Sequence, residues 1–225
     1  MGATELNATG RVREGQAVGV RGVVLDYGEV VARPPADARL GRIAAAVGLD
    51  RPALVERYDR ERPLYDRGDI TPQAYWSKVV PATVELNAEL LGKLRRWDVE
   101  MWSHTNPVMI EWLARLRTAG FKTALLSNMH CDMVVRVRRD LEWFKQLDFA
   151  VLSSEVHLAK PERAIYQRCL AGLALEPSEA LFIDDRGVNV QAAIDAGWQA
   201  LRFQSPELLC NDLAGMGFPI LPTLR

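Results

Sequence analysis

Three carboxylates stand where apolar runs of this sequence end. Asp26 follows the run 20–25 shortly before a glycine, and the pair Asp184-Asp185 follows Ala-Leu-Phe-Ile. Such runs are typical of strands buried on both faces of a parallel sheet, and open α/β folds hold their ligands at the carboxyl ends of those strands. Adjacent carboxylates repel each other unless a cation or hydrogen-bond donors offset their charge. An aspartate close to a glycine is also ordinary turn chemistry, so Asp26 alone does not define a site.

Two further segments contribute a hydroxyl, an amide and an ammonium group. Ser127 and Asn128 end the apolar run Thr-Ala-Leu-Leu, and Lys160 stands before Pro161. Taken alone, Ser127-Asn128 is also consistent with a turn or a helix cap, and Lys160 with a solvated surface residue. The four segments arrive in order, three of them at the ends of expected strands. Their combination of carboxylates, donors and one ammonium group indicates a single polar site.

The four segments resemble the sequence motifs of the haloacid dehalogenase superfamily. The residues that carry the resemblance are Asp26 with Val30, Ser127-Asn128, Lys160-Pro161 and Asp184-Asp185. The similarity spans about residues 20 to 205 and is greatest to a phosphatase-like branch whose first motif reads Asp-x-Gly-x-Val. That branch includes sugar-phosphate phosphatases, and the phosphatase-like domain of mammalian epoxide hydrolases is related to it. The resemblance implies an α/β fold, a Rossmann-like parallel sheet core with an inserted α-helical cap.

The same resemblance implies a hydrolase that depends on Mg²⁺ and releases phosphate from a small phosphorylated metabolite. Asp26 would be both the nucleophile, forming an aspartyl-phosphate, and a metal ligand. Asp185 and the main-chain carbonyl of Gly28 would complete a set of oxygen ligands that suits Mg²⁺. Asp184 would bind through water or orient its neighbours, and the order of roles within the pair stays open.

The remaining motif residues would act on the substrate. Ser127 and Asn128 would donate hydrogen bonds to phosphoryl oxygens. Lys160 would neutralise charge and keep Asp26 ionised, a role that suits a compact ammonium group. We therefore expect Asp26, Ser127, Asn128 and Lys160 to be the catalytic residues.

Gly28 departs from the usual first motif of the superfamily. Most of its phosphatases carry a second aspartate at this position, which serves as general acid and base. Proton transfer of this kind contributes roughly 10²–10⁴-fold to the rate. Three interpretations stay open: slower catalysis, a substitute acid such as Glu29, His130 or a cap residue, or a substrate whose leaving group needs little protonation.

Two other functional classes stay open. The protein could be a pseudo-enzyme or binding module that keeps the fold and the metal without useful turnover. A C–halogen hydrolase is disfavoured, because dehalogenase first motifs resemble Asp-x-Tyr-Gly-Thr. In this chain Tyr27 stands one place too early, Val30 replaces the threonine, and the acidic pair favours a cation.

The elements that would position these residues alternate along the chain. The expected strands lie at 20–25, 122–127, 148–153, 180–184 and 199–203. Helices are expected from Pro107 to Gly120, from Pro161 to about Leu173 and from Val188 to Ala196. The alternation of strand and helix predicts a parallel sheet with right-handed crossovers.

The interval 33–104 breaks this alternation. It holds only helical patterns, at 37–47, 52–65, 72–84 and 85–96, and is too long to be a loop. We expect a helical cap over a core of residues 20–32 and 105–225, although extra helices packed rigidly on the sheet would give the same pattern. The segment 65–69 is the expected exposed tip, which either meets the substrate or forms a solvated charged turn. Residues 1–19 lack periodicity and are expected to form a flexible arm.

The composition limits the expected partners. The 225 residues carry a formal net charge of −1, with 48% hydrophobic and 25% charged residues, so nucleic acid and anionic membranes are not expected as partners. The three cysteines are widely spaced and fit free thiols in a reducing compartment. Without an apolar run of membrane-spanning length or a secretory signal pattern, we expect a cytoplasmic protein that acts on a small phosphorylated molecule.

Overall fold

A parallel sheet forms the centre of the core. The computed structural model describes residues 19–224, and its strands are β1 (Gly22–Leu25), β2 (Lys122–Ser127), β3 (Phe149–Leu152), β4 (Ala180–Asp184) and β5 (Gln199–Arg202). The five strands lie in the order β3-β2-β1-β4-β5, and every neighbouring pair is parallel. Each strand begins and ends within two residues of its predicted bounds. The arm expected over residues 1–19 lies outside the described residues except for Gly19.

The register of the sheet brings two carboxylates to the same edge. Leu25 of β1 lies opposite Ile183 of β4, so the next residues along these strands are Asp26 and Asp184. The backbone N–H of Asp26 donates to the carbonyl of Ile183 at 2.9 Å and continues the ladder. Parallel strands end at the same edge, so both side chains leave the sheet together.

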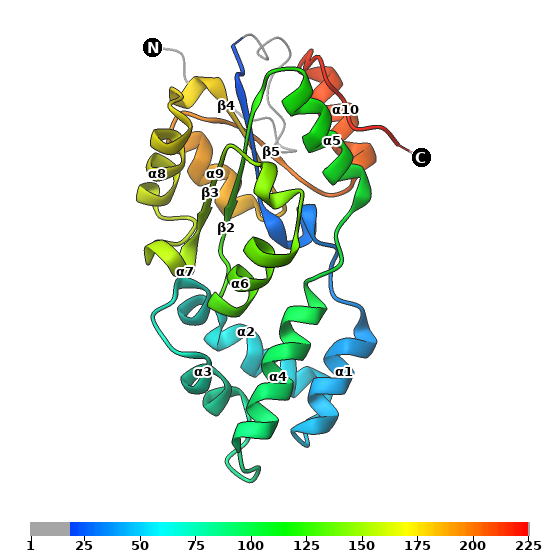
Figure 1. The fold of residues 1–225 in the computed structure, drawn as a ribbon, viewed down its shortest axis with the longest axis vertical. Helices are drawn as coiled ribbons and strands as arrows, with labels where there is room; N and C mark the ends of the chain where they lie inside the picture. The colour runs from blue at the N-terminus through cyan, green and yellow to red at the C-terminus, as the bar shows by residue number, and fades with distance from the viewer. Residues whose placement is uncertain (1–18, 225) are drawn as a thin grey trace.

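Helices cover both faces of the sheet (Figure 1). One face packs against α5 (Pro107–Thr118), α6 (Cys131–Asp140) and α10 (Pro206–Gly215), and the other against α8 (Arg163–Leu173) and α9 (Gly187–Asp195). Val23 and Leu25 of β1 belong to the first core, whereas Val24 belongs to the second. This alternation between two buried faces explains the continuous apolar runs of the sequence. The sequence patterns did not predict α6, α10 or the single turn α7 (Ser153–Val156).

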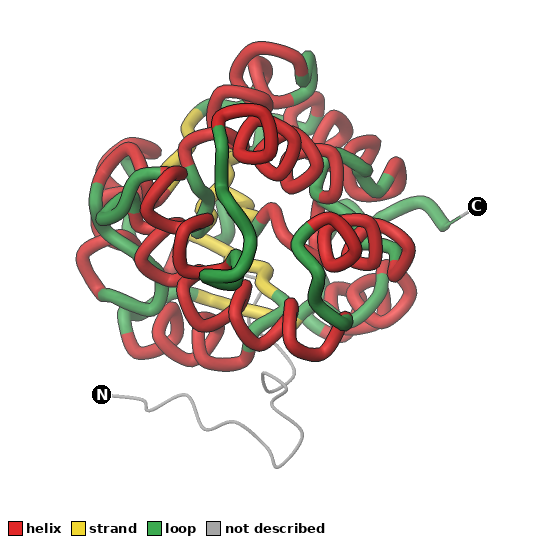
Figure 2. Tube along the Cα trace, turned by 90° about the horizontal axis from the view of Figure 1, so that it is seen from below, coloured by secondary structure: helices red, strands yellow, loops and turns green. Residues whose placement is uncertain are grey.

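Four helices inserted between β1 and β2 form a second lobe. They are α1 (Asp37–Ala46), α2 (Arg51–Arg67), α3 (Pro72–Val79) and α4 (Ala88–Met101). The lobe has its own apolar core, which includes the fully buried Tyr75 and Trp76. Asp50, Thr71 and Asn87 cap α2, α3 and α4, each accepting a backbone N–H at the start of its helix. Figure 2 is seen from the side of this lobe, with the strands behind its helices.

Two helices of the lobe differ clearly from their predicted bounds. The helix predicted over 72–84 ends at Val79, because Val80 is extended and precedes Pro81. The helix predicted over 85–96 starts after its cap Asn87 and continues to Met101. Within residues 19–224, the structure contains no helix long and apolar enough to cross a membrane.

Candidate active site

Lys160 joins two carboxylates at the carboxyl end of the sheet. Its Nζ lies 2.8 Å from Oδ1 of Asp26 and 2.6 Å from Oδ2 of Asp184. Burial lowers the pKa of Lys160, but the two carboxylates outweigh this effect and raise that pKa above its usual value. Burial also raises the pKa of Asp26, an effect that Lys160 opposes. The ammonium group therefore carries its charge between two carboxylates that are both excluded from bulk water.

Asp184 is held in one orientation by several donors. Nδ2 of Asn189 lies 3.0 and 3.1 Å from its two oxygens, and the backbone N–H of Arg186 donates to Oδ1 at 2.8 Å. Asn189 lies near the start of α9, and the hydroxyl of Tyr166 donates to its carbonyl at 2.9 Å. Asp184 is thus suited to orienting its neighbours, one of the two roles left open by the sequence. Its partner Asn189 follows five residues later in the chain, and the sequence patterns did not predict a role for this residue.

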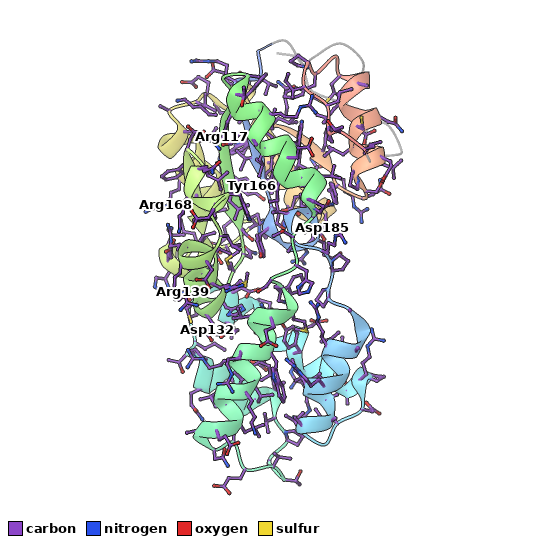
Figure 3. All side chains as sticks on the ribbon, turned by 45° about the vertical axis from the view of Figure 1, so that its right-hand side comes forward. Arg117, Asp132, Arg139, Tyr166, Arg168 and Asp185 are labelled. Atoms are coloured by element: carbon purple, nitrogen blue, oxygen red, sulfur yellow. The ribbon has the colours of Figure 1, made fainter. Side chains whose placement is uncertain are left out.

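Asp185 lies at the end of the core that faces the helical lobe (Figure 3). One oxygen from each of Asp26, Asp184 and Asp185 lies within 4.8 Å of the other two. Burial, followed by the charges of Asp26, Asp184 and Glu29, raises the pKa of Asp185 to about 7. A divalent cation among these oxygens would offset the repulsion, so the donor set fits Mg²⁺ in both charge and ligand type.

Ser127 and Asn128 both have partners within the protein. The side chain of Asn128 accepts the backbone N–H of Lys160 at 2.8 Å and donates to the carbonyl of the same residue at 2.9 Å. Ser127 is 2% exposed and lies beside Asp26, whose pKa it acts to lower. Asn128 therefore positions the backbone of Lys160, and Ser127 supports the carboxylate of Asp26. Their hydrogen bonds to a phosphoryl group stay a prediction.

The turn after Asp26 leaves space beside Gly28. This glycine has φ −61° and ψ 131°, a conformation open to any residue, and a Cβ atom on it would lie 3.7 Å from Cζ3 of Trp102. The left-handed position of the turn belongs instead to the exposed Glu29, with φ 57°. The backbone would therefore accept a carboxylate at position 28, although the sequence supplies none there.

The segment 65–69 is not the exposed tip expected from the sequence. Tyr65 is 1% exposed and stacks on His130, with ring centroids 4.7 Å apart. A Cβ atom on Gly68 would lie 2.8 Å from the backbone oxygen of Ser154. The close approach of these two segments of the chain therefore requires a glycine at position 68. The end of α2 is therefore docked on the core. Local patterns did not reveal this, because the docking depends on segments far away in the sequence.

A polar network lies inside the lobe around the fully buried Asp98. Arg62 lies 3.1 Å from both oxygens of Asp98, and the hydroxyl of Tyr58 donates to it at 2.5 Å. Arg62 also donates to Asp66 at 2.8 Å, and Nε1 of Trp102 donates to the hydroxyl of Tyr58 at 3.3 Å. Burial raises the pKa of Asp66 to about 6, although Arg62 opposes this shift. The network connects Trp102 with the last turn of α2.

His130 is buried where α6 begins, between the lobe and the core. Its Nε2 lies 3.5 Å from Oδ2 of Asp98, and its ring is 1% exposed. Burial lowers the pKa of His130 to about 4. The ring is therefore neutral near pH 7 and is a poor proton donor, which weakens it as a candidate for the missing acid.

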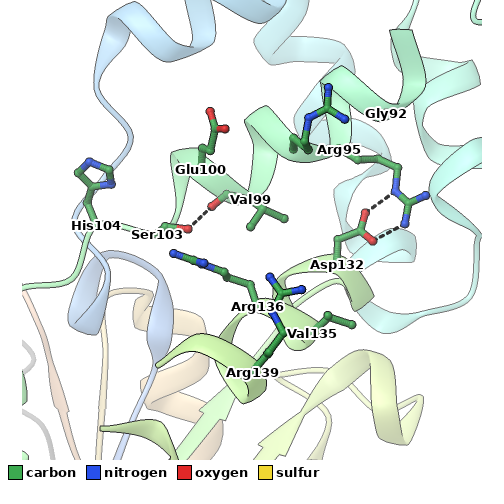
Figure 4. A pocket seen from close by; sticks show the side chains of 11 residues that line it. Gly92, Arg95, Val99, Glu100, Ser103, His104, Asp132, Val135, Arg136 and Arg139 are labelled. Carbon is green, nitrogen blue, oxygen red and sulfur yellow. Dashed lines mark hydrogen bonds and ion pairs between the residues drawn. The ribbon is translucent and has the colours of Figure 1, made fainter. Parts of the chain in front are cut away.

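A cleft of about 700 Å³ lies between α4 and α6 (Figure 4). Arg95, Arg96, Arg136 and Arg139 contribute to its lining. Arg95 of α4 forms two hydrogen bonds to Asp132 of α6, at 2.7 and 2.5 Å. None of the four polar segments is among the residues that line this cleft.

The chain matches a family of hydrolases. Residues 19–197 match the haloacid dehalogenase-like hydrolase family. The match covers most of the chain, and the protein therefore belongs to this family. The expected superfamily and the expected fold class are thereby confirmed.

One curated relative and two solved structures illustrate the similarity. Acyl-CoA dehydrogenase family member 10 of Mus musculus is 35% identical over 119 residues, which are 51% of this chain but only 11% of the mouse protein. A HAD family enzyme from Bacteroides thetaiotaomicron, the wild-type protein in complex with magnesium and inorganic phosphate, has a TM-score of 0.66 and 18% identity over 83% of this chain and 95% of that one. The L-2-haloacid dehalogenase from Xanthobacter autotrophicus, with chloropropionic acid covalently bound, has a TM-score of 0.65 and 19% identity over 90% of this chain and 85% of that one. At these identities, each similarity establishes that this chain has the same fold as the solved structure, and nothing about its activity.

Proposed function

We propose that the protein is a Mg²⁺-dependent phosphatase that acts on a small phosphorylated metabolite through an aspartyl-phosphate on Asp26. The observation that supports this proposal is the cluster of Asp26, Asp184 and Asp185 beside Lys160. Three carboxylates and one ammonium group leave an excess of negative charge, which would repel a phosphate dianion. A bound Mg²⁺ supplies the positive charge that offsets this repulsion.

Asp26 would carry the covalent step. One of its oxygens forms a bond to phosphorus while the bond from phosphorus to the leaving oxygen breaks. Water then attacks phosphorus, so that phosphate leaves and the carboxylate of Asp26 is restored. Lys160, whose Nζ lies 2.8 Å from Oδ1 of Asp26, would hold this side chain through both steps.

The other residues divide into ligands and positioning residues. Asp26, Asp185 and the carbonyl of Gly28 would hold the cation. Asp184 orients Lys160, to which it is hydrogen-bonded at 2.6 Å. The helical lobe would serve as the cap that excludes water and selects the substrate. The magnesium and phosphate in the complex of the Bacteroides enzyme support the same chemistry in this fold.

The test is a panel of phosphorylated metabolites and 2-haloacids, assayed for phosphate and halide with Mg²⁺ and with a chelator. We expect at least one phosphorylated compound to release phosphate, and only when Mg²⁺ is present. Halide release that does not need a metal would contradict the proposal and identify a dehalogenase. Mg²⁺ binding without turnover of any compound would also contradict it and identify a binding protein.

A further inference from the structure

The helical lobe carries a partly buried carboxyl group, that of Asp66, whose backbone is hydrogen-bonded to the core close to the Ser127-Asn128 segment. We propose that Asp66 is the general acid that protonates the leaving group, in place of the carboxyl group that Gly28 does not supply. This inference rests on the proposed function, because it assigns a proton donor to the step in which Asp26 is phosphorylated.

The backbone of Asp66 is fixed to the loops that carry the polar segments. The hydroxyl of Ser153 accepts the backbone N–H of Met129 at 2.8 Å and donates to the carbonyl of Asp66. Met129 directly follows Asn128, which clamps Lys160. The hydroxyl of Ser153 therefore connects Asp66, in the last turn of α2, with Met129 through two successive hydrogen bonds.

The residues on either side of Asp66 are docked as well. The hydroxyl of Tyr65 donates to Asp132 at 3.2 Å, and Arg67 forms an ion pair with Glu162, two residues beyond Lys160. These contacts leave little freedom for the backbone between them. A catalytic carboxyl group needs such a fixed position, because proton transfer requires hydrogen-bond distance to the reacting oxygen.

The side chain of Asp66 is directed into the protein. It is 16% exposed and accepts a hydrogen bond from Nε of Arg62 at 2.8 Å. Burial raises the pKa of Asp66, the charge of Arg62 lowers it and the charge of Asp98 raises it. The charge of Asp26 raises this pKa further. Asp66 of α2 thus lies within electrostatic reach of the nucleophile at the end of β1, although the two residues belong to different lobes.

A chain of contacts connects Asp66 with the empty position beside Gly28. Trp102 lies against Gly28 and donates to Tyr58. Arg62 donates to the same Tyr58 hydroxyl and also to Asp66. The carboxyl group of Asp66 therefore belongs to the same polar network as Trp102, the residue that lies against Gly28.

The protonation of Asp66 suits the role. Burial raises its pKa to about 6, with Arg62 opposing and Asp98 and Asp26 supporting the shift. Its O–H would give the proton to the leaving oxygen as the bond from that oxygen to phosphorus breaks. The resulting carboxylate, paired with Arg62, would then accept a proton from the water that attacks phosphorus. Asp66 is thereby returned to its acid form.

The test measures kcat/KM with Mg²⁺ over phosphate esters that range from dinitrophenyl to simple alkyl leaving groups. We expect the wild-type protein to show a shallow dependence on leaving-group acidity. Asp66→Asn should lose roughly 10²–10⁴-fold on alkyl phosphates and little on dinitrophenyl phosphate, which needs no proton. Gly28→Asp introduced into the Asp66→Asn protein should recover part of the alkyl activity, since the backbone at position 28 accepts a side chain.

Asp69→Asn is the matched control, because it makes the same chemical change in an exposed residue three places along the chain. Its leaving-group dependence should stay that of the wild type. A uniform loss on all esters in Asp66→Asn would overturn the inference and leave a positioning role. A steep dependence in the wild-type protein would overturn it without any variant, and therefore even if Asp66→Asn failed to fold. Failure of the proposed function is distinct, because the wild-type protein would then release no phosphate from any ester.

Discussion

Nζ of Lys160 lies 2.6 Å from Oδ2 of Asp184, and both side chains are excluded from solvent. The same ammonium group reaches Asp26, so it is the positive partner of two buried carboxylates. The resemblance to the family predicted a role for Lys160 in charge neutralisation. The structure adds that removing the lysine would leave two buried carboxylates without their cation.

Lys160→Ala should therefore lose stability as well as phosphate release. Removing one partner of a buried ion pair costs about 3–5 kcal/mol, because the remaining charge stays buried and unpaired. Saturating Mg²⁺ should recover part of this loss in the variant, since the cation would lie near the same carboxylates. Urea denaturation with Mg²⁺ and with EDTA measures both effects. Equal stabilities of the variant and wild-type proteins without metal would contradict this account of Lys160.

Asp185→Asn should weaken Mg²⁺ binding with little effect on stability. Asp185 is half-buried and faces the lobe, whereas Asp184 is fully buried and accepts hydrogen bonds from Asn189, Arg186 and Lys160. Asp184→Asn is the matched comparison and should lower the melting temperature. Calorimetric titration with MgCl₂ and thermal denaturation separate the two roles. Unchanged Mg²⁺ affinity in Asp185→Asn would remove this residue from the set of ligands.

Gly68→Ala should disturb the docking of α2 on the core. Its φ is +83°, and a Cβ atom would lie 2.8 Å from the backbone oxygen of Ser154. The left-handed conformation alone costs about 1–2 kcal/mol for alanine, and the close contact adds about 1–3 kcal/mol. Gly48→Ala is the control, because Gly48 has φ +67° but open space around it. Comparable losses of stability in the two variants would contradict the docked position of α2.

His130 should make the protein sensitive to acid. Burial lowers its pKa to about 4, and the neighbouring charges of Asp98, Arg62, Asp132 and Arg95 partly offset one another. In the unfolded chain its pKa is about 6.5, so the unfolded state binds the proton first as the pH falls. The free energy of unfolding therefore falls by about 3 kcal/mol through His130 as the pH is lowered from 6.5 to 4. Above pH 6.5 this residue has no such effect.

The variant His130→Gln isolates this effect. Asp66, with its raised pKa, acts in the opposite direction over nearly the same window, so the stability of the wild-type protein alone does not reveal His130. The stability of the variant relative to the wild type should rise as the pH falls from 7 to 4.5. Urea denaturation at several pH values measures it, and a constant difference would show that His130 does not titrate as described.

The sheet was predictable because its strands are buried on both faces. The run 180–184 contains only apolar residues before the terminal aspartate, which marks both the strand and its carboxyl end. The convergence of the three polar segments at strand ends followed from the same rule, whereas Lys160 lies in a turn that the rule does not place. The helix α6 was missed, although Met133, Val134 and Val137 form an apolar face along it. Its start at His130 carries no side-chain cap, and β-branched residues also favour strands.

The contribution of the lobe to the site was not predictable from local patterns. Asp66 stands in a charged, glycine-containing segment that is typical of a solvated turn. Its burial depends on Ser153, Arg62 and Asp98, which lie in three different elements. Arg62 and Asp66 are an i, i+4 pair on α2, but no spacing rule connects them with Ser153 or Asp98, which come close only when the elements pack.

Phosphate release by Asp26→Asn is the most direct test of the proposed mechanism. The assay compares the variant with the wild type in Mg²⁺, on the best substrate of the panel, with circular dichroism to confirm that both proteins are folded. The amide of asparagine cannot attack phosphorus as a carboxylate does, so release should fall to the background of a mock preparation. A folded Asp26→Asn protein that releases phosphate at close to the wild-type rate would contradict the role of Asp26 as nucleophile.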